Sequence, residues 1–183
     1  MDSGENSYNR FLMGDTEGLY EIIKAYRKGL MLYLNSFVQN IHTAEELTED
    51  TFWELMLKRP KFSGKSTFKT WLYAIGRNIT VKYLRKHTKL SIVPLELQEN
   101  LDDEENIEKN YIKTEQKRMV HQALHRLKLE YRQVVYLICF EGFSNTETAL
   151  IMKKSNRQIK DLLYNAKKAL KNELERSGFE YEE

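Results

Sequence analysis

The chain is 183 residues long, which fits one ordinary domain or two small ones. Charged residues make up 31% and hydrophobic residues 41%, which excludes wholesale disorder, and 8 glycines with 2 prolines argue against an all-β or collagen-like chain. The 29 lysines and arginines nearly balance the 27 aspartates and glutamates, but the net charge of +2 conceals a strong segregation of charge along the sequence.

Several sequence features limit the compartment and the chemistry. The single cysteine, Cys139, excludes an intramolecular disulfide and a multi-cysteine zinc site, and its place in the apolar run Val134–Phe140 predicts a buried thiol. No stretch approaches the roughly 20 apolar residues of a membrane span. The polar segment Met1–Arg10 lacks the order of a signal peptide. We therefore expect a soluble, cytoplasmic protein without membrane insertion.

The N-terminal half predicts two amphipathic helices in succession. Apolar residues recur at spacings of three and four from Leu19 to Phe37, which indicates one long helix with a wide buried face. The next helix is predicted to start near Thr43, with Glu46 three residues later as a capping-box partner. It is predicted to stop before Pro60, because the residue preceding a proline disfavours helix.

A basic segment follows these helices. Lys58–Thr67 is predicted to be a basic loop, and one of the two hydroxyl residues at its end then caps a third helix over Phe68–Lys86. No acidic residue occurs between residues 71 and 90. A helix with one apolar and one purely basic side is typical of a surface that meets phosphate, whereas a merely solvated face usually mixes both signs. The basic residues of this helix are Arg77, Lys82, Arg85 and Lys86.

The charge balance inverts between Glu96 and Glu108, where acidic residues occur without a lysine or arginine. Pro94 and the sparse apolar residues make this segment a linker candidate. A soluble spacer is the favoured interpretation, and transient screening of basic surfaces is the alternative. The predicted fold is therefore all-α, with two small helical domains at residues 1–88 and 113–183 joined by an acidic flexible linker at 89–112.

Helical periodicity resumes near Tyr111 and continues to Ile138. Gly142 is a natural helix C-cap, and Ser144 with Glu147 three residues later predicts a capping box at the start of a short helix. A turn at residues 153–155 then leads into a last helix from about residue 156 to residue 174. Two helices of unequal length joined by so short a turn form a helix-turn-helix, whose second helix reads DNA in known examples.

Patterns associated with catalysis or ligand chemistry are weak in this sequence. The Gly-Lys-Ser run at residues 64–66 resembles the end of a phosphate-binding loop, but Arg59 stands where that motif needs its first glycine. His121 and His125 are four residues apart on a predicted helix, but no third metal ligand is evident, so surface or partly buried histidines are favoured. No nucleophile–base signature is found. The sequence thus predicts no enzyme, no cofactor and no metal site.

Two blocks of the sequence carry a resemblance to a known family. The first block comprises TAEELTEDTF from Thr43 to Phe52, then Lys61-Phe62, then STFKTWLYAIGRN from residue 66 to residue 78. It closely resembles region two of extracytoplasmic-function (ECF) sigma factors, the two-domain sigma subunits of bacterial RNA polymerase, and the C-terminal helix-turn-helix resembles their region four. The resemblance covers most of the chain. It implies a protein that directs core RNA polymerase to specific promoters and initiates transcription by recognising and melting them.

The same resemblance implies three groups of site residues and their partners. The residues expected to bind the clamp helices of the largest polymerase subunit are Glu46, Leu47, Glu49, Asp50, Phe52 and Trp53. Leu47 and Phe52 are alternatively plain core residues. The residues expected at the melted minus-ten element are Lys61, Phe62, Ser63, Lys65, Arg77, Asn78, Lys82 and Arg85. The residues expected on the minus-thirty-five duplex are Asn156, Arg157, Lys160, Asp161, Tyr164 and Lys167. The polymerase flap and an anti-sigma protein are further candidate partners, and the expected location is the cytoplasm, at the nucleoid when bound to polymerase.

The second block departs from the family pattern at several positions. Lys128 replaces a usual proline. Lys153 stands where the turn usually has a glycine, which predicts either a costly left-handed backbone at Lys153 or a changed turn. Arg157 replaces a common glycine, and Asp161 offers a carboxylate that accepts from cytosine but repels phosphate. The fold of region four is thus expected, but its promoter preference does not transfer. The alternative function is a stand-alone helix-turn-helix regulator that binds operator DNA without polymerase.

Overall fold

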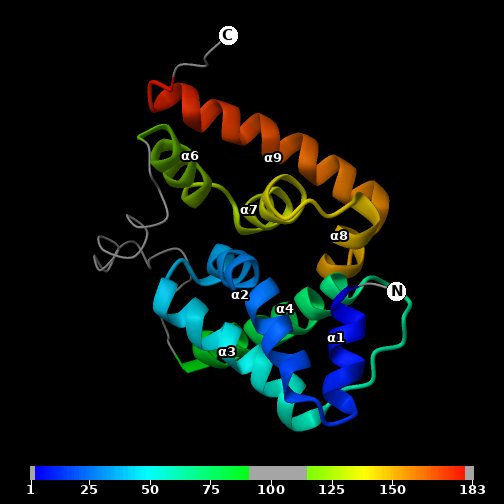
Figure 1. Cartoon of the computed structure of the whole chain (residues 1–183). Coiled ribbons are helices and arrows are strands. Elements are labelled where there is room, and N and C mark those ends of the chain that lie inside the picture. The colour runs from blue at the N-terminus through cyan, green and yellow to red at the C-terminus, as the bar shows by residue number, and fades with distance from the viewer. Residues whose placement is uncertain (1–2, 91–114, 180–183) are drawn as a thin grey trace.

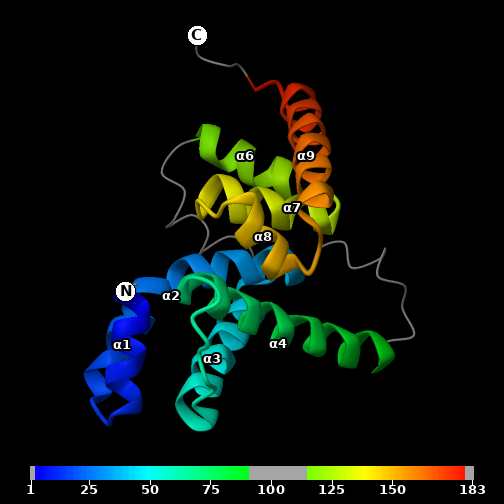
Figure 2. The ribbon, with the colours of Figure 1, turned by 90° about the vertical axis from the view of Figure 1, so that its right-hand side faces the viewer.

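The computed structural model describes residues 3–90 and 115–179 of the chain. Within these ranges all regular structure is helical, which confirms the predicted all-α fold. Figure 1 and Figure 2 show an N-terminal and a C-terminal group of helices stacked against each other. The acidic linker predicted at 89–112 falls almost entirely outside the described residues and stays a prediction.

The first module is built around a long central helix. Its helices are α1 (Ser3–Leu12), α2 (Thr16–Val38), α3 (Ile41–Lys58) and α4 (Phe68–Leu90). Helix α2 packs against the other helices of this module, and Figure 2 shows it lying between them and the second module. The long helix predicted from Leu19 to Phe37 is confirmed, because the apolar residues Ile22, Leu30 and Leu34 on α2 are fully buried.

Helix α1 is not predicted by the sequence periodicity, because the segment is rich in serine and asparagine and carries few apolar residues. Its buried side consists chiefly of Tyr8 and Phe11, which pack into the core of the module. A β-carbon at Gly18 of α2 would collide with the carbonyl oxygen of Ser7. The close crossing of α1 and α2 therefore requires a glycine at that position.

The ends of α3 correct one predicted cap and confirm one predicted stop. The N-cap is Asn40, whose side-chain oxygen accepts the backbone N–H of Thr43 at 3.0 Å, so Thr43 lies inside the first turn and is not the cap. The helix ends at Lys58, and Arg59 adopts a left-handed backbone with φ of 44°. The chain thus leaves the helix before Pro60, as predicted.

The second module places a long helix over shorter ones. Its elements are α6 (Glu115–His125), α7 (Leu129–Val135), the π-helix η2 (Tyr136–Phe140), α8 (Asn145–Met152) and α9 (Asn156–Arg176). Helix α9 packs on α6, α7 and α8, and Figure 1 shows it along the outer side of the module. The helices predicted on either side of the turn at 153–155 are both present.

The π-helix η2 overturns the prediction of a buried cysteine. Its backbone hydrogen bonds join residues five apart in the sequence, since the Glu141 N–H donates to the Tyr136 carbonyl at 3.0 Å. One extra residue per turn rotates the following side chains away from the face that an α-helix would have buried. Tyr136 and Leu137 stay in the core, whereas Cys139 and Phe140 at the end of the apolar run are exposed.

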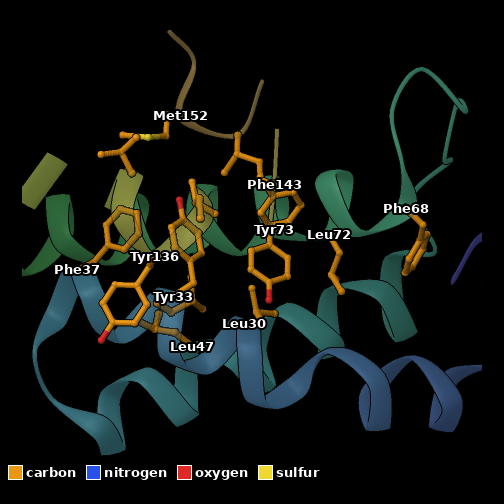
Figure 3. Packing of buried hydrophobic residues seen from close by; sticks show 14 of the residues in the cluster. Leu30, Tyr33, Phe37, Leu47, Phe68, Leu72, Tyr73, Tyr136, Phe143 and Met152 are labelled. Atoms are coloured by element: carbon orange, nitrogen blue, oxygen red, sulfur yellow. The ribbon is translucent and has the colours of Figure 1, made fainter. Parts of the chain in front are cut away.

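The two modules share a continuous hydrophobic core, a packing that the sequence does not predict. Helix α2 contacts α7 and η2, and α4 contacts α8. Tyr33 of α2 stacks on Tyr73 of α4 at 5.6 Å between ring centroids, and Tyr73 meets Phe143 of the second module edge-on at 5.0 Å. Figure 3 shows this layer, with Phe37 and Tyr33 on one side and Tyr136, Phe143 and Met152 on the other.

Candidate nucleic-acid interface

The helix-turn-helix of the second module is fixed by local hydrogen bonds that the sequence predicts. Ser144 and Glu147 form the expected capping box, because the Ser144 N–H donates to the Glu147 carboxylate at 2.9 Å and the Glu147 N–H donates to the Ser144 hydroxyl at 3.2 Å. Helix α8 ends at Met152, and its C-cap Lys153 adopts a left-handed backbone with φ of 55°, the first of the two alternatives predicted there. Ser155 caps α9 and forms a second capping box with Gln158. Sequence analysis missed this box, although the Ser-x-x-Gln pattern predicts one.

The outer face of α9 is open to solvent over its first turns. Ile159 and Ala166 on the opposite side of the helix are fully buried and hold it on the module. The exposed residues include all those predicted to meet the minus-thirty-five duplex: Asn156, Arg157, Lys160, Asp161, Tyr164 and Lys167. Beside this face lies a hollow of about 600 Å³ between the start of α7 and α9, lined in part by Lys128, Lys154 and Asp161.

The loop before α4 and the outer side of α4 form one basic, exposed surface. Lys61, Ser63 and Lys65 project from the loop into solvent. The exposed side chains of Asn78, Lys82 and Arg85 are four and three residues apart, a spacing that places them on one face of the helix. Arg77 is set apart from them, since it is half-buried and its Nε is buried without a hydrogen-bond partner in the part of the chain that the structure describes.

Phe62, the candidate stacking residue of the loop, belongs to an aromatic cluster. Its ring is half-buried and lies 5.8 Å from the ring of Phe68 and 5.2 Å from that of Trp71. Phe68 is fully buried and Trp71 is half-buried, so both support Phe62 from below. The ring of Phe62 is therefore partly accessible to solvent and partly packed on these two rings.

Helix α1 holds the start of the same loop, a role that sequence reasoning missed. The hydroxyl of Tyr8 donates a hydrogen bond to the carbonyl oxygen of Pro60 at 2.7 Å, and its ring lies 5.4 Å from that of Trp71. The guanidinium of Arg59 lies 5.1 Å above the ring of Phe11. Burial raises the pKa of Tyr8 to about 12, with Arg59 opposing the shift, so the hydroxyl stays a donor at neutral pH. No pattern within α1 itself signals this contact.

Helix α3 presents an acidic and apolar face to solvent. Glu46, Glu49, Asp50 and Trp53 are exposed, the last with 53% of its surface accessible. Leu47 and Phe52, predicted alongside them, are instead 2% and 6% exposed and lie in the core of the module. Leu57 is 72% exposed and extends the face by one turn beyond Trp53. Sequence analysis does not single out Leu57, because the pattern of apolar residues does not distinguish an exposed leucine from a buried one.

The described residues contain no cluster of three or more side chains suited to hold a metal ion. His121 lies with its Nδ1 3.4 Å from the hydroxyl of Tyr136 and its ring 6.3 Å from that of Phe140. Over residues 3–90 and 115–179, no helix combines the length and the apolar character needed to cross a lipid bilayer.

Family models match both modules. The model for sigma-70 region 2 matches residues 22–90, and the model for sigma-70 region 4 matches residues 117–170. The two matches together span about two-thirds of the chain, in the order and with the helix-turn-helix that the structure shows. The chain belongs to the sigma-70 family of bacterial RNA polymerase sigma factors. Within that family it is an ECF sigma factor, as its relatives indicate.

The relatives cover nearly the whole chain. The chain is 25% identical over 170 residues to the RNA polymerase sigma factor YlaC of Bacillus subtilis, covering 90% of this chain and 96% of that protein. It is 26% identical over 151 residues to the ECF sigma factor SigM of the same organism, covering 82% and 91% of the two chains.

Solved structures support the fold. The sigma factor RpoE from Bartonella quintana, solved with the anti-sigma factor NepR, matches with a TM-score of 0.65 at 23% identity, covering 85% of this chain and 96% of that one. CnrH, solved with the cytosolic domain of CnrY, matches with a TM-score of 0.68 at 18% identity, covering 96% and 99%. The matches to both sigma-70 regions and the named relatives make the function that of a sigma factor, which directs core RNA polymerase to promoters. A stand-alone regulator is not favoured, because region 2 would then have no role.

Proposed function

We propose that the exposed face of α3 docks this sigma factor on the clamp helices of the largest polymerase subunit. Glu46, Glu49 and Asp50 supply carboxylates, while Trp53 and Leu57 supply apolar anchors. Tryptophan is enriched among interface hot spots, and charged groups around such an anchor steer the encounter with a partner of opposite charge. Leu47 and Phe52 support this face from the core rather than contacting the polymerase.

The loop at residues 59–67 and the exposed face of α4 are proposed to hold the melted minus-ten strand. Phe62 offers a ring face to an extruded base, and Ser63 and Asn78 offer hydrogen bonds to its edge. Lys61, Lys65, Lys82 and Arg85 lie along the same surface and suit the phosphate backbone. Arg77 is half-buried, so it is proposed to contact the strand from the inner margin of this surface rather than from its exposed part.

The first turns of α9 are proposed to enter the major groove of the minus-thirty-five element. Asn156, Arg157 and Lys160 are placed at the N-terminal end, which is the part of a recognition helix that reaches base edges. Asp161 and Tyr164 lie one turn further on the same side, with Lys167 available for phosphate. The polymerase flap is proposed as the protein partner of this module.

The proposal extends to the roles that follow from these surfaces. The protein contributes binding and strand separation, and the polymerase supplies all the catalysis. It acts in the cytoplasm, at the nucleoid when bound to polymerase, and an anti-sigma protein is a candidate partner, as the solved complexes of similar folds illustrate. The domain limits proposed are residues 1–88 and 113–183, with the linker at 89–112.

The observation that carries this assignment of sites is the acid-free, exposed basic surface of α4 combined with the open first turns of α9 in one chain. Run-off transcription with purified core polymerase on a promoter library tests it. Transcripts that depend on the protein are expected, and Lys160→Ala is expected to reduce them. Lys171→Ala is the matched control, because Lys171 is an exposed lysine on the same helix but lies outside the proposed contact. Equal loss in both variants, or in neither, would show that the recognition face is misplaced.

A further inference from the structure

One acidic residue lies among the basic side chains of α9. Between residues 153 and 171 every charged residue except Asp161 is a lysine or an arginine. The side chain of Asp161 is exposed. Because successive residues of an α-helix are rotated by about 100°, Asp161 lies nearly opposite the fully buried Ile159, at the centre of the outer face of the helix. Figure 1 shows this helix along the outer side of the second module.

The structure gives the Asp161 carboxylate no stabilising partner. The other two acids of α9 are paired with cations, since the Glu173 carboxylate lies 3.0 Å from the guanidinium of Arg176 and the Glu175 carboxylate lies 3.7 Å from the ammonium of Lys171. Within the described part of the chain, the side chain of Asp161 forms no ion pair and no hydrogen bond. It also lies beyond the first turn of α9, where the helix dipole favours a negative charge. The stability of α9 therefore does not account for this residue.

A carboxylate at the outer face of a recognition helix suits one base edge of the major groove. It accepts hydrogen bonds and donates none, so it needs a donor on the DNA. Guanine and thymine offer acceptors there, whereas cytosine and adenine offer an amino group. The amino group of adenine is flanked by two acceptors, its own N7 and the O4 of the paired thymine, and both repel a carboxylate. Cytosine N4 has such a neighbour on one side only, so cytosine is the base that a carboxylate selects.

The residue one turn earlier has the complementary chemistry. Arg157 is exposed on the same face of α9, four residues before Asp161. Four residues rise about 6 Å along a helix, which is close to two base-pair steps. Arginine commonly donates two hydrogen bonds to guanine O6 and N7. Arg157 and Asp161 are thus spaced to contact neighbouring base pairs, and the cation offsets part of the repulsion between the carboxylate and the phosphates.

We propose that Asp161 selects a cytosine in the minus-thirty-five element and is a specificity-determining residue of this sigma factor. The inference rests on the proposed function, because it assigns a base to the contact between α9 and the minus-thirty-five duplex. The same negative charge is repelled by the phosphates of any DNA. Asp161 therefore favours the correct sequence over other sequences rather than strengthening binding to all of them.

The test uses holoenzyme assembled from the full chain and core polymerase, with a pool of promoters whose minus-thirty-five segment is randomised. The minus-ten sequence is fixed and is taken from a promoter that the wild-type protein uses. Sequencing of the transcribed templates gives the base preference at each position. Asp161→Asn keeps the size of the side chain but adds a donor, and Asp161→Ala removes the polar group. Glu175→Gln is the matched control, because it removes the same charge from an exposed position near the other end of α9.

The wild-type protein is expected to prefer cytosine at one position by roughly tenfold, as befits one base contact. Asp161→Ala is expected to lose the preference at that position and to keep the others. Asp161→Asn is expected to turn it toward adenine, because an amide donates to N7 and accepts from the N6 amino group. Glu175→Gln is expected to keep the wild-type profile at every position.

Three outcomes would overturn the inference. A wild-type profile without a cytosine-selecting position would do so, and so would a cytosine preference that persists in both Asp161 variants, since the carboxylate is then a solvated charge. Equal relaxation at every position, or loss of all transcription in Asp161→Ala, would contradict a role limited to one base. Each of these leaves the sigma function standing, because the wild-type protein still gives transcripts. No transcripts with the wild-type protein would instead overturn the proposed function.

Discussion

Replacing Arg132 by methionine is expected to destabilise the protein more than any surface substitution. Arg132 lies on α7 and is 8% exposed. Its Nε donates to the carbonyl oxygen of Ser36 on α2 at 3.0 Å, and its Nη1 donates to those of His125 and Leu127 at 2.8 and 3.1 Å. One guanidinium thus donates to backbone carbonyls at the end of α6, in the turn after it and in the last turn of α2.

The magnitude follows from what the substitution leaves behind. The bonds to Ser36 and Leu127 are buried, so their carbonyls lose their partner without gaining water, at about 1–3 kcal/mol each. The carbonyl of His125 keeps a partner, because the side-chain amide of Gln39 also donates to it at 2.7 Å, so losing the Arg132 bond there adds little. Burial lowers the pKa of Arg132, a sign of the desolvation that methionine relieves, and this offsets part of the loss. The net cost is expected to be about 2–4 kcal/mol.

Urea denaturation followed by circular dichroism measures this cost, with Arg132→Lys as the matched control. Lysine keeps the charge but lacks the planar fork that reaches several carbonyls at once, so it is expected to recover only part of the stability. A loss below about 1 kcal/mol for the methionine variant, or full recovery with lysine, would refute the reasoning from unsatisfied carbonyls.

Three further outcomes are expected. Lys160→Ala should reduce promoter-specific transcription with a stability change within about 0.5 kcal/mol, whereas Ile159→Ala, its buried neighbour, should cost about 2–5 kcal/mol in chemical denaturation; equal effects on stability would contradict the placement of the helix face. Tyr8→Phe should keep the aromatic packing but lose the bond to Pro60, about 1 kcal/mol, and should lower permanganate reactivity of the melted minus-ten strand while binding to a minus-thirty-five duplex stays constant. Lys153→Gly should raise the melting temperature by about 2–4 °C, because glycine adopts the left-handed backbone without the conformational free-energy cost that lysine carries there. A lower melting temperature would show that the left-handed backbone at Lys153 carries no such cost.

The features predictable from sequence are those set by neighbouring residues. The capping box of Ser144 and Glu147 and the turn at Lys153 each depend on a few consecutive residues. The structure confirms the capping box and shows the left-handed alternative at Lys153. The open face of α9 follows equally from helical spacing, since Ile159 fixes which side is buried. Local rules therefore describe the helix-turn-helix well.

The features that escape prediction depend on contacts distant in the sequence. Helix α1 is stabilised by burying Tyr8 against α4 and Pro60, and its own composition carries no such signal. The register change in η2 comes from one extra residue in a turn, which moves Cys139 to the surface although its neighbours are apolar. Most of all, the contact between Tyr73 and Glu141 joins residues 68 positions apart, and no pattern in either segment predicts that the two meet.

The exposed position of Cys139 gives the molecule a built-in reporter. It is the only cysteine in the chain, and it lies two residues before Glu141, at the edge of the contact between the modules. A maleimide dye therefore attaches at a single, known site without any substitution. Its emission senses the local polarity at that edge, so mixing the labelled protein with core polymerase in a stopped-flow instrument measures whether, and how fast, the surroundings of Cys139 change on binding.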